Sequence, residues 1–181
     1  MQKIKLQLIF PTLLLCVLAA AAGCITGALT AGFGRVLLWI GTFRTEHLIS
    51  CVPFLPIAGV CMVWIYQKYG RESSQGMSLI FDAADGTAKR IPLRLIPLLI
   101  GSTWLTHLCG GSAGREGAAL QLGGSVGSML GRVFRLAERD KQVLMLCGMS
   151  AAFSAIFRTP IAAPVFAMEV VCVGAMRYAA L

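Results

Sequence analysis

The stretch GGSAGREGAALQLGGS, residues 110–125, places an arginine next to a glutamate inside a run of small and apolar residues. A charged side chain at the centre of a bilayer costs roughly 2.5–3.5 kcal/mol on insertion scales, so two adjacent charges in an apolar sequence need a physical reason. The stretch is therefore either a surface loop or a functional site. The rest of the sequence helps to decide between these two interpretations.

The composition is that of a membrane protein. Of the 181 residues, 57% are hydrophobic and 13% are charged, and the mean hydropathy is +0.77. Soluble domains carry about 25% charged residues, and their apolar runs are too short to span a bilayer. In a membrane protein, lysine and arginine mark cytoplasmic loops, so the net charge of +8 does not indicate a nucleic-acid partner.

Six apolar segments predict an all-α, polytopic membrane fold. They cover residues 6–40, 47–69, 91–109, 118–134, 143–157 and 161–176. The first begins like a signal peptide, but its apolar run continues past any cleavage point, which favours a transmembrane helix. The last three are short and contain glycine, serine or proline, which is typical of broken or re-entrant helices.

The basic residues predict the orientation. They cluster before the first segment, around the polar stretch 67–90 and after the fourth segment: Lys3, Lys5; Lys68, Arg71, Lys89, Arg90, Arg94; Arg132, Arg135, Arg139, Lys141. A cytoplasmic N-terminus places all three clusters in the cytoplasm. The chain is then a multi-pass protein of the cell membrane, and residues 110–117 lie at or below the outer membrane face.

A glycine-rich turn that opens a helix is a natural anion site. The unpaired N–H groups and the helix dipole put about half a positive charge at that end. Glu116 stands at this helix start, so its carboxylate can occupy the site as a built-in anion, and protonation would let a solute anion replace it. The alternative is that Glu116 pairs with Arg115 in a water-exposed loop, and the residues alone leave both open.

Other patterns indicate packing rather than chemistry. Gly123, Gly127 and Gly131 recur at four-residue spacing, which is typical of a helix face in close contact with another helix. The seven cysteines stand singly, without the spacing of a metal or disulfide site. The chain shows no nucleophile–base pair, metal cluster or phosphate loop, so we expect neither an enzyme nor a cofactor.

Three ordered elements resemble the CLC family of chloride channels and anion/proton antiporters. GGSAGREGAALQLGGSVGSMLGR, residues 110–132, is similar to the family's glutamate-bearing signature, and residues 149–171 resemble the segment that follows it. GMSLI, residues 76–80, lies where the family has its anion-binding turn. The resemblance implies that Glu116 gates the anion path and couples it to protons, and that the anion is bound by Gly76, Met77, Ser78, Gly114, Arg115, Gly117 and Ala118.

The departures from the family pattern resemble its fluoride/proton antiporter branch. Met77 stands where the chloride-selecting turn usually has serine, and Ala118 replaces the usual proline. Methionine has no hydroxyl to donate, which argues against a chloride site built on that group. Glu169 is followed by Val170 rather than by a second acid, so the inner proton-transfer carboxylate of chloride/proton exchangers is not supported.

The resemblance covers about the first half of a typical family member. Residues 1–181 are therefore expected to form one transmembrane unit, the N-terminal half of a truncated transporter that would be a homodimer when complete. Three functions follow: an antiporter exchanging a small anion, fluoride above all, for protons; a chloride channel or chloride/proton exchanger; or a non-transporting remnant. The expected partners are the anion, protons and membrane lipid.

Overall fold

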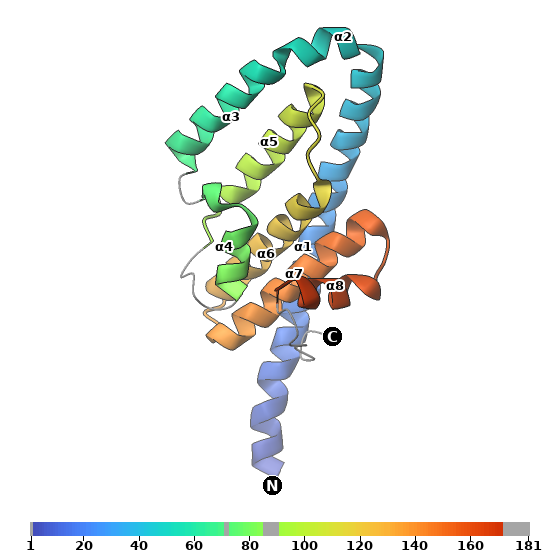
Figure 1. Cartoon of the computed structure of the whole chain (residues 1–181). Helices are drawn as coiled ribbons and strands as arrows, with labels where there is room; N and C mark the ends of the chain where they lie inside the picture. The colour runs from blue at the N-terminus through green and yellow to red at the C-terminus, as the bar shows by residue number, and fades with distance from the viewer. Residues whose placement is uncertain (1, 71–72, 85–90, 172–181) are drawn as a thin grey trace.

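The computed structural model describes residues 2–70, 73–84 and 91–171, and every regular element in these ranges is a helix (Figure 1). The elements are α1 (Gln2–Glu46), α2 (Leu48–Cys51), the 3₁₀ helix η1 (Val52–Phe54), α3 (Leu55–Tyr69), the 3₁₀ helix η2 (Ser73–Gln75), α4 (Met77–Ala84), α5 (Leu95–Leu108), α6 (Arg115–Val133), α7 (Glu138–Phe157) and α8 (Ala162–Val171). The all-α prediction is confirmed. Of the predicted features, Arg71, Lys89, Arg90, Cys172 and residues 172–176 lie outside the described ranges.

Two described helical stretches are long and apolar enough to cross a membrane. They are Thr12–Glu46 and Leu48–Tyr69, with a hydropathy of 2.2 in each case. Only 17% and 6% of their most apolar windows are buried within the chain, so most of their apolar surface faces outward. The first helix continues beyond the predicted end at residue 40. The second breaks into α2, η1 and α3, where Pro53 and Pro56 supply no N–H donors.

Helices α6 and α7 touch backbone to backbone along a line of glycines, the glycine seam: Gly123, Gly127 and Gly131 on α6 and Gly148 on α7. A Cβ added to Gly127 would lie 2.7 Å from the Cα of Met145, and one on Gly131 would lie 2.8 Å from the Cγ of Lys141. Gly123 and Gly148 would each meet the other's carbonyl oxygen. The predicted close-packing face is confirmed, and it fixes α6 against α7.

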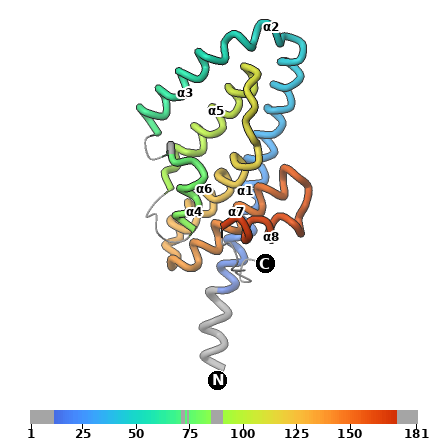
Figure 2. Tube along the Cα trace, in the orientation of Figure 1, coloured from blue at the N-terminus to red at the C-terminus, as the bar shows by residue number. Residues whose placement is uncertain are grey.

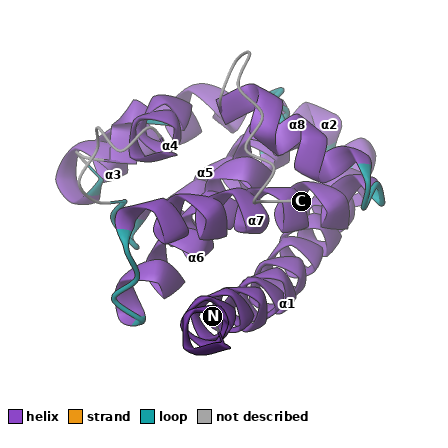
Figure 3. Ribbon diagram, turned by 90° about the horizontal axis from the view of Figure 1, so that it is seen from below, coloured by secondary structure: helices purple, strands orange, loops and turns teal. Residues whose placement is uncertain are grey.

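Helix α1 covers one side of this pair through a single stripe of buried side chains. Leu18 and Ala22 pack in one cluster with Val126, Leu130 and Leu144. About three turns further along, Phe33 and Leu37 pack with Ala118 and Leu122. Figure 3 shows α1 at one edge of the fold, with α5, α6 and α7 in the middle.

On another side of α6, the short helices α4 and α8 complete the core. Leu79 and Ile80 of α4 share a buried cluster with Leu120 of α6, and α8 adds Ala167. Gly124 makes room for this contact, because a Cβ there would lie 3.2 Å from the Cγ2 of Ile80. The glycines of α6 thus allow α7 to pack closely on one face of α6 and α4 on another.

The fold has two distinct ends. At one end, α1 turns into α2 and α5 finishes, and the Nη1 of Arg44 donates to the carbonyl oxygen of His107 at 3.4 Å. The α6–α7 turn and the end of α4 lie toward the other end, at the lower left of Figure 1, and α3 ends above them on the same side. Of the described basic residues in the second and third predicted clusters, Lys68 lies in the last turn of α3, Arg94 is the N-cap residue of α5, and Arg132 lies in the last turn of α6.

Candidate functional site

The GREG stretch forms the start of α6 after a sharp return of the chain. Helix α5 ends at Leu108, and Gly110 follows with a φ of 85°, a left-handed conformation that glycine adopts easily. The N–H of Gly111 then donates to the carbonyl oxygen of Thr106 at 2.8 Å. From there the chain runs back alongside α5, and α6 begins part-way along the fold rather than at its end (Figures 1 and 2). The charged pair Arg115 and Glu116 therefore stands at a helix start that lies part-way along the fold.

The carboxylate of Glu116 folds back over this helix start. Gly114 is the N-cap residue, with an extended backbone and no side-chain cap. The Oε2 of Glu116 lies 2.9 Å from the position that a Cβ would take on Gly114. The first N–H groups of a helix lack intrahelical partners and carry the positive end of its dipole. The only acid in the first turn of α6 therefore lies beside the N-cap residue, on the side of these N–H groups.

The neighbouring candidates divide between the surface and the core. Arg115 and Glu116 are both exposed, and in the described part of the chain they form no ion pair with each other. Gly117 has open space where a Cβ would stand. Ala118 is 4% exposed and packs with Phe33 and Leu37 of α1, so its side chain anchors the first turn of α6.

The second candidate segment forms the start of α4. Gly76 has a φ of 62°, which lets the chain turn from η2 into α4 at Met77. The hydroxyl of Ser78 donates to the carbonyl oxygen of Gln75 at 2.7 Å. Met77 is half-buried and packs on the cluster that contains Leu120. The hydroxyl of Ser78 is thus used within its own turn, and the thioether side chain of Met77 packs on the core.

The core brings the two segments together. Leu79 and Ile80, just after Met77, share a cluster with Leu120, one turn after Glu116. Among the described residues, no hydrogen bond or ion pair joins the candidate side chains of one segment to those of the other. The packing thus joins the first turn of α4 to α6 at Leu120 and Gly124, one to two turns after Glu116. Each helix start follows a glycine and offers backbone N–H donors.

Sequence reasoning missed a second feature at the lower end of the fold. Two adjoining pockets are lined by basic residues that the sequence analysis used only as markers of topology. Arg135, one of them, has a φ of 50°, which is uncommon for a residue other than glycine. No local sequence pattern predicts the two pockets or the left-handed backbone of Arg135. The described residues hold no group of three or more potential metal ligands.

Comparison with known proteins gives one family and several relatives. The model of the family described as voltage gated chloride channel matches residues 58–181. A chloride/fluoride channel protein of Pseudomonas syringae pv. tomato is 41% identical over 166 residues, which are 90% of this chain and 36% of that protein. An H(+)/Cl(-) exchange transporter ClcA of Citrobacter koseri is 26% identical, over 83% of this chain and 35% of its own length. The chain thus spans about a third of the length of these relatives.

Two solved structures share the fold. A CLC-type fluoride/proton antiporter superposes with a TM-score of 0.91 at 45% sequence identity, over 95% of this chain and 43% of the other. A slow cyanobacterial Cl-/H+ antiporter superposes with a TM-score of 0.69 at 24% identity, over 81% of this chain and 37% of the other. The second comparison bears on the fold alone.

Proposed function

Because the chain belongs to the voltage gated chloride channel family, we propose that it is part of a membrane antiporter that exchanges a small anion, fluoride above all, for protons. Since it spans about a third of its relatives' length, the proposal concerns the product of the full reading frame that contains this sequence. The observation that carries it is the carboxylate of Glu116, folded back over the start of α6.

The geometry supports a simple coupling step. When Glu116 is ionised, its carboxylate competes with a solute anion for the positive end of α6. Protonation removes the charge, weakens the hold of the N–H groups, and frees the place for the solute anion. Gly114, Arg115, Gly117 and Ala118 would shape that place, and Gly76, Met77 and Ser78 would contribute the start of α4. One side chain then links the movement of a proton to that of an anion.

Met77 and the relatives favour fluoride over chloride. The protein at 41% identity is named for chloride and fluoride, and the structure with a TM-score of 0.91 is a fluoride/proton antiporter. A methionine at the start of α4 offers no hydroxyl to a chloride ion. The second candidate, a chloride channel or chloride/proton exchanger, is favoured by the ClcA relatives. A non-transporting remnant remains the third.

Fluoride and chloride efflux tests the proposal, with Met77→Ser as the diagnostic variant. In liposomes that hold the full reading-frame product, we expect fast fluoride and slow chloride efflux, followed with ion-selective electrodes. Met77→Ser should raise chloride transport, because one hydrogen bond to an anion is worth roughly 1.5–3 kcal/mol, or about ten- to a hundredfold in affinity.

Met62→Ser is the matched control for this experiment. Met62 is also half-buried, but it lies on α3, where its sulfur accepts from Thr106 at 3.4 Å. Its replacement should leave the ratio of fluoride to chloride efflux unchanged. Equal rates for the two anions in the wild type would reject fluoride and favour the chloride alternative. The absence of any efflux would favour the remnant.

We also propose that the N-terminus and the α6–α7 turn face the cytoplasm. Cysteine labelling tests this in a background whose native cysteines are replaced by alanine. A cysteine at Arg139, near the start of α7, should resist an impermeant reagent added to intact cells. One at Glu46, at the opposite end of α1, should react. Labelling of the Arg139→Cys variant alone would reverse the orientation.

We also propose a single membrane domain for this chain and a dimeric assembly for the full product. Residues 1–181 would form a single membrane domain, because core clusters join α1, α4, α5, α6, α7 and α8. The full product would be a homodimer in the cell membrane, as the resemblance implies. Light scattering of the purified full product in detergent measures its mass, and the mass of a monomer would contradict this assembly.

A further inference from the structure

Four helix ends meet at the lower end of the fold around two adjoining pockets. One, of about 630 Å³, lies between the end of α3 and the start of α5 and is lined by Lys68, Ser73 and Arg94 among others. The other, of about 750 Å³, lies at the α6–α7 turn and is lined by Arg132, Arg135 and Lys141 among others. Leu93 lines both, so the two pockets adjoin, and together they are called the basic groove.

Part of the positive charge in the basic groove is already engaged. The Nζ of Lys141 lies 2.8 Å from the Oε1 of Glu138. The Nζ of Lys68 lies 4.8 Å from the ring centroid of Trp64 and 5.4 Å from that of Tyr69. These two lysines therefore have partners within the chain, and the arginines carry most of the charge that remains.

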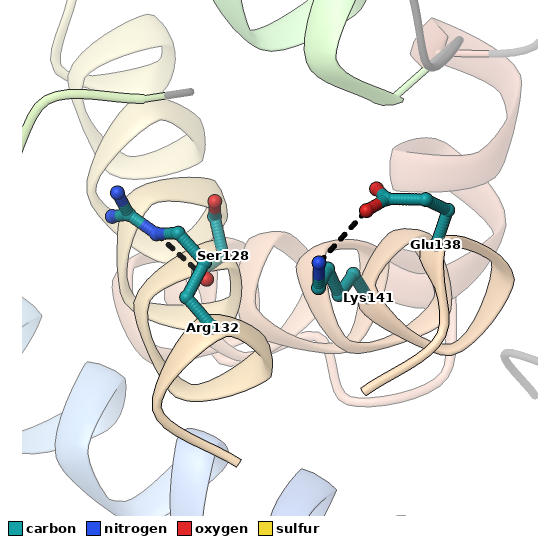
Figure 4. Close-up of polar contacts among 4 residues, drawn as sticks. All are labelled: Ser128, Arg132, Glu138 and Lys141. Carbon is teal, nitrogen blue, oxygen red and sulfur yellow. Dashed lines mark hydrogen bonds and ion pairs between the residues drawn. The ribbon is translucent and has the colours of Figure 1, made fainter. Parts of the chain in front are cut away.

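Two polar groups in the basic groove are buried without a partner among the described residues. Arg132 uses its Nε to donate to the carbonyl oxygen of Ser128 at 3.4 Å, but its Nη2 is buried and unpaired. Figure 4 shows its guanidinium pointing away from the Lys141–Glu138 pair. Ser73 is 2% exposed, and its Oγ is likewise unpaired. Buried donors normally have acceptors, so both groups are available to donate to a ligand rich in oxygen atoms.

The backbone of Arg135 supports the same conclusion. The N–H of Leu136 donates to the carbonyl oxygen of Gly131 at 2.9 Å, which closes the end of α6 in the motif that usually places glycine in a left-handed conformation. Here Arg135 takes that place with a φ of 50°, although a Cβ disfavours it. A cation is thus kept at a position where a glycine would fit with less strain.

The rim of the basic groove is apolar and exposed. Leu93 is 47% exposed, Val133 68% and Phe134 51%. The groove lies at the end of α3, which closes the apolar stretch Leu48–Tyr69, and the ends of membrane-spanning helices lie near the lipid headgroups. A free anion would use only the basic residues, whereas a phospholipid would use the rim as well. We propose that the basic groove binds an anionic phospholipid, with its phosphate on Arg94, Arg132 and Arg135 and its acyl chains along the rim.

Native mass spectrometry of the purified chain in detergent tests this site. Phosphatidylglycerol should bind at least about tenfold more tightly than phosphatidylcholine with the same acyl chains. Arg94→Gln and Arg132→Gln should each lower the affinity for phosphatidylglycerol about tenfold, the usual loss for one charge-assisted hydrogen bond. Arg139→Gln is the matched control, because Arg139 is exposed at the same end and lines neither pocket.

A further variant separates binding from folding. Arg135→Gly should lower the affinity for phosphatidylglycerol as well, while the melting temperature stays equal or rises, because glycine fits the left-handed position. An equal loss on Arg139→Gln would show general charge attraction and overturn the proposal. So would displacement of phosphatidylglycerol by inorganic phosphate, since that would identify a free anion as the occupant. Neither outcome depends on transport, so the proposed antiport is tested separately.

Discussion

Replacing Glu116 with glutamine in the full reading-frame product is expected to abolish proton movement. Glutamine keeps the shape of the side chain, but it neither carries a negative charge nor exchanges a proton. It therefore cannot compete as an anion for the start of α6, where the wild-type carboxylate lies over Gly114. Anion movement without coupled protons, or a block of both, is consistent with the proposal. Proton and fluoride fluxes recorded together in the same liposomes measure the effect.

Glu46→Gln provides the control for this variant. Glu46 is also exposed, but it is the last residue of α1, at the negative end of that helix's dipole. The same change of charge there should leave the ratio of protons to anions at its wild-type value. A wild-type ratio in Glu116→Gln would refute the coupling role of the carboxylate. An equal effect in both variants would point to surface charge instead of a specific site.

The substitution with the largest expected effect on stability is Gly127→Ala in the glycine seam. The new Cβ would overlap the carbonyl oxygen of Leu144 and lie 2.7 Å from the Cα of Met145. These are backbone atoms, so no flexible side chain can move aside, and α6 and α7 must separate. We expect a loss of about 3 kcal/mol or more in the free energy of unfolding. Equilibrium unfolding of the purified chain in detergent measures it.

Gly27→Ala makes the same chemical change where space is free. Gly27 lies inside α1, and nothing lies within 4 Å of the Cβ it would gain. Alanine is a better helix former than glycine, so this variant should gain roughly 0.5–1 kcal/mol. Opposite signs for the two variants would establish that contact at the seam, rather than helix propensity, decides the outcome. A stable Gly127→Ala protein would contradict the packing of α6 on α7.

The sequence predicts which segments of this fold are helical better than it predicts the residues at which each helix begins and ends. Apolar runs locate every long helix, because burial in lipid or core selects the same residues. They miss polar first turns: α7 begins at Glu138 rather than near residue 143, since Glu138 and Asp140 suit the positive end of a helix. The sequence predicts a single span over residues 47–69, but two prolines divide it. Residues 77–80, expected as part of a turn, begin the helix α4.

The candidate site was predictable in its residues but not in its geometry. The charged pair in an apolar run singles out Glu116, and the glycine before it predicts a helix start. Only the structure shows that the carboxylate turns back over Gly114 or that Ala118 packs in the core. The basic groove depends on helix ends that are far apart in the chain, so no local pattern predicts that Arg94 and Arg132 line adjoining pockets.

The glycine seam also has an electrical consequence. A protein that holds protons and anions apart fails if water fills a gap between its helices, because ions follow the water. Along Gly123 and Gly127 the backbones of α6 and α7 leave no room for a methyl group. A water molecule, with a radius of about 1.4 Å, is excluded as well. The contact therefore closes this side of α6 to water, and in the proposed antiport an ion would reach Glu116 along another face of the helix.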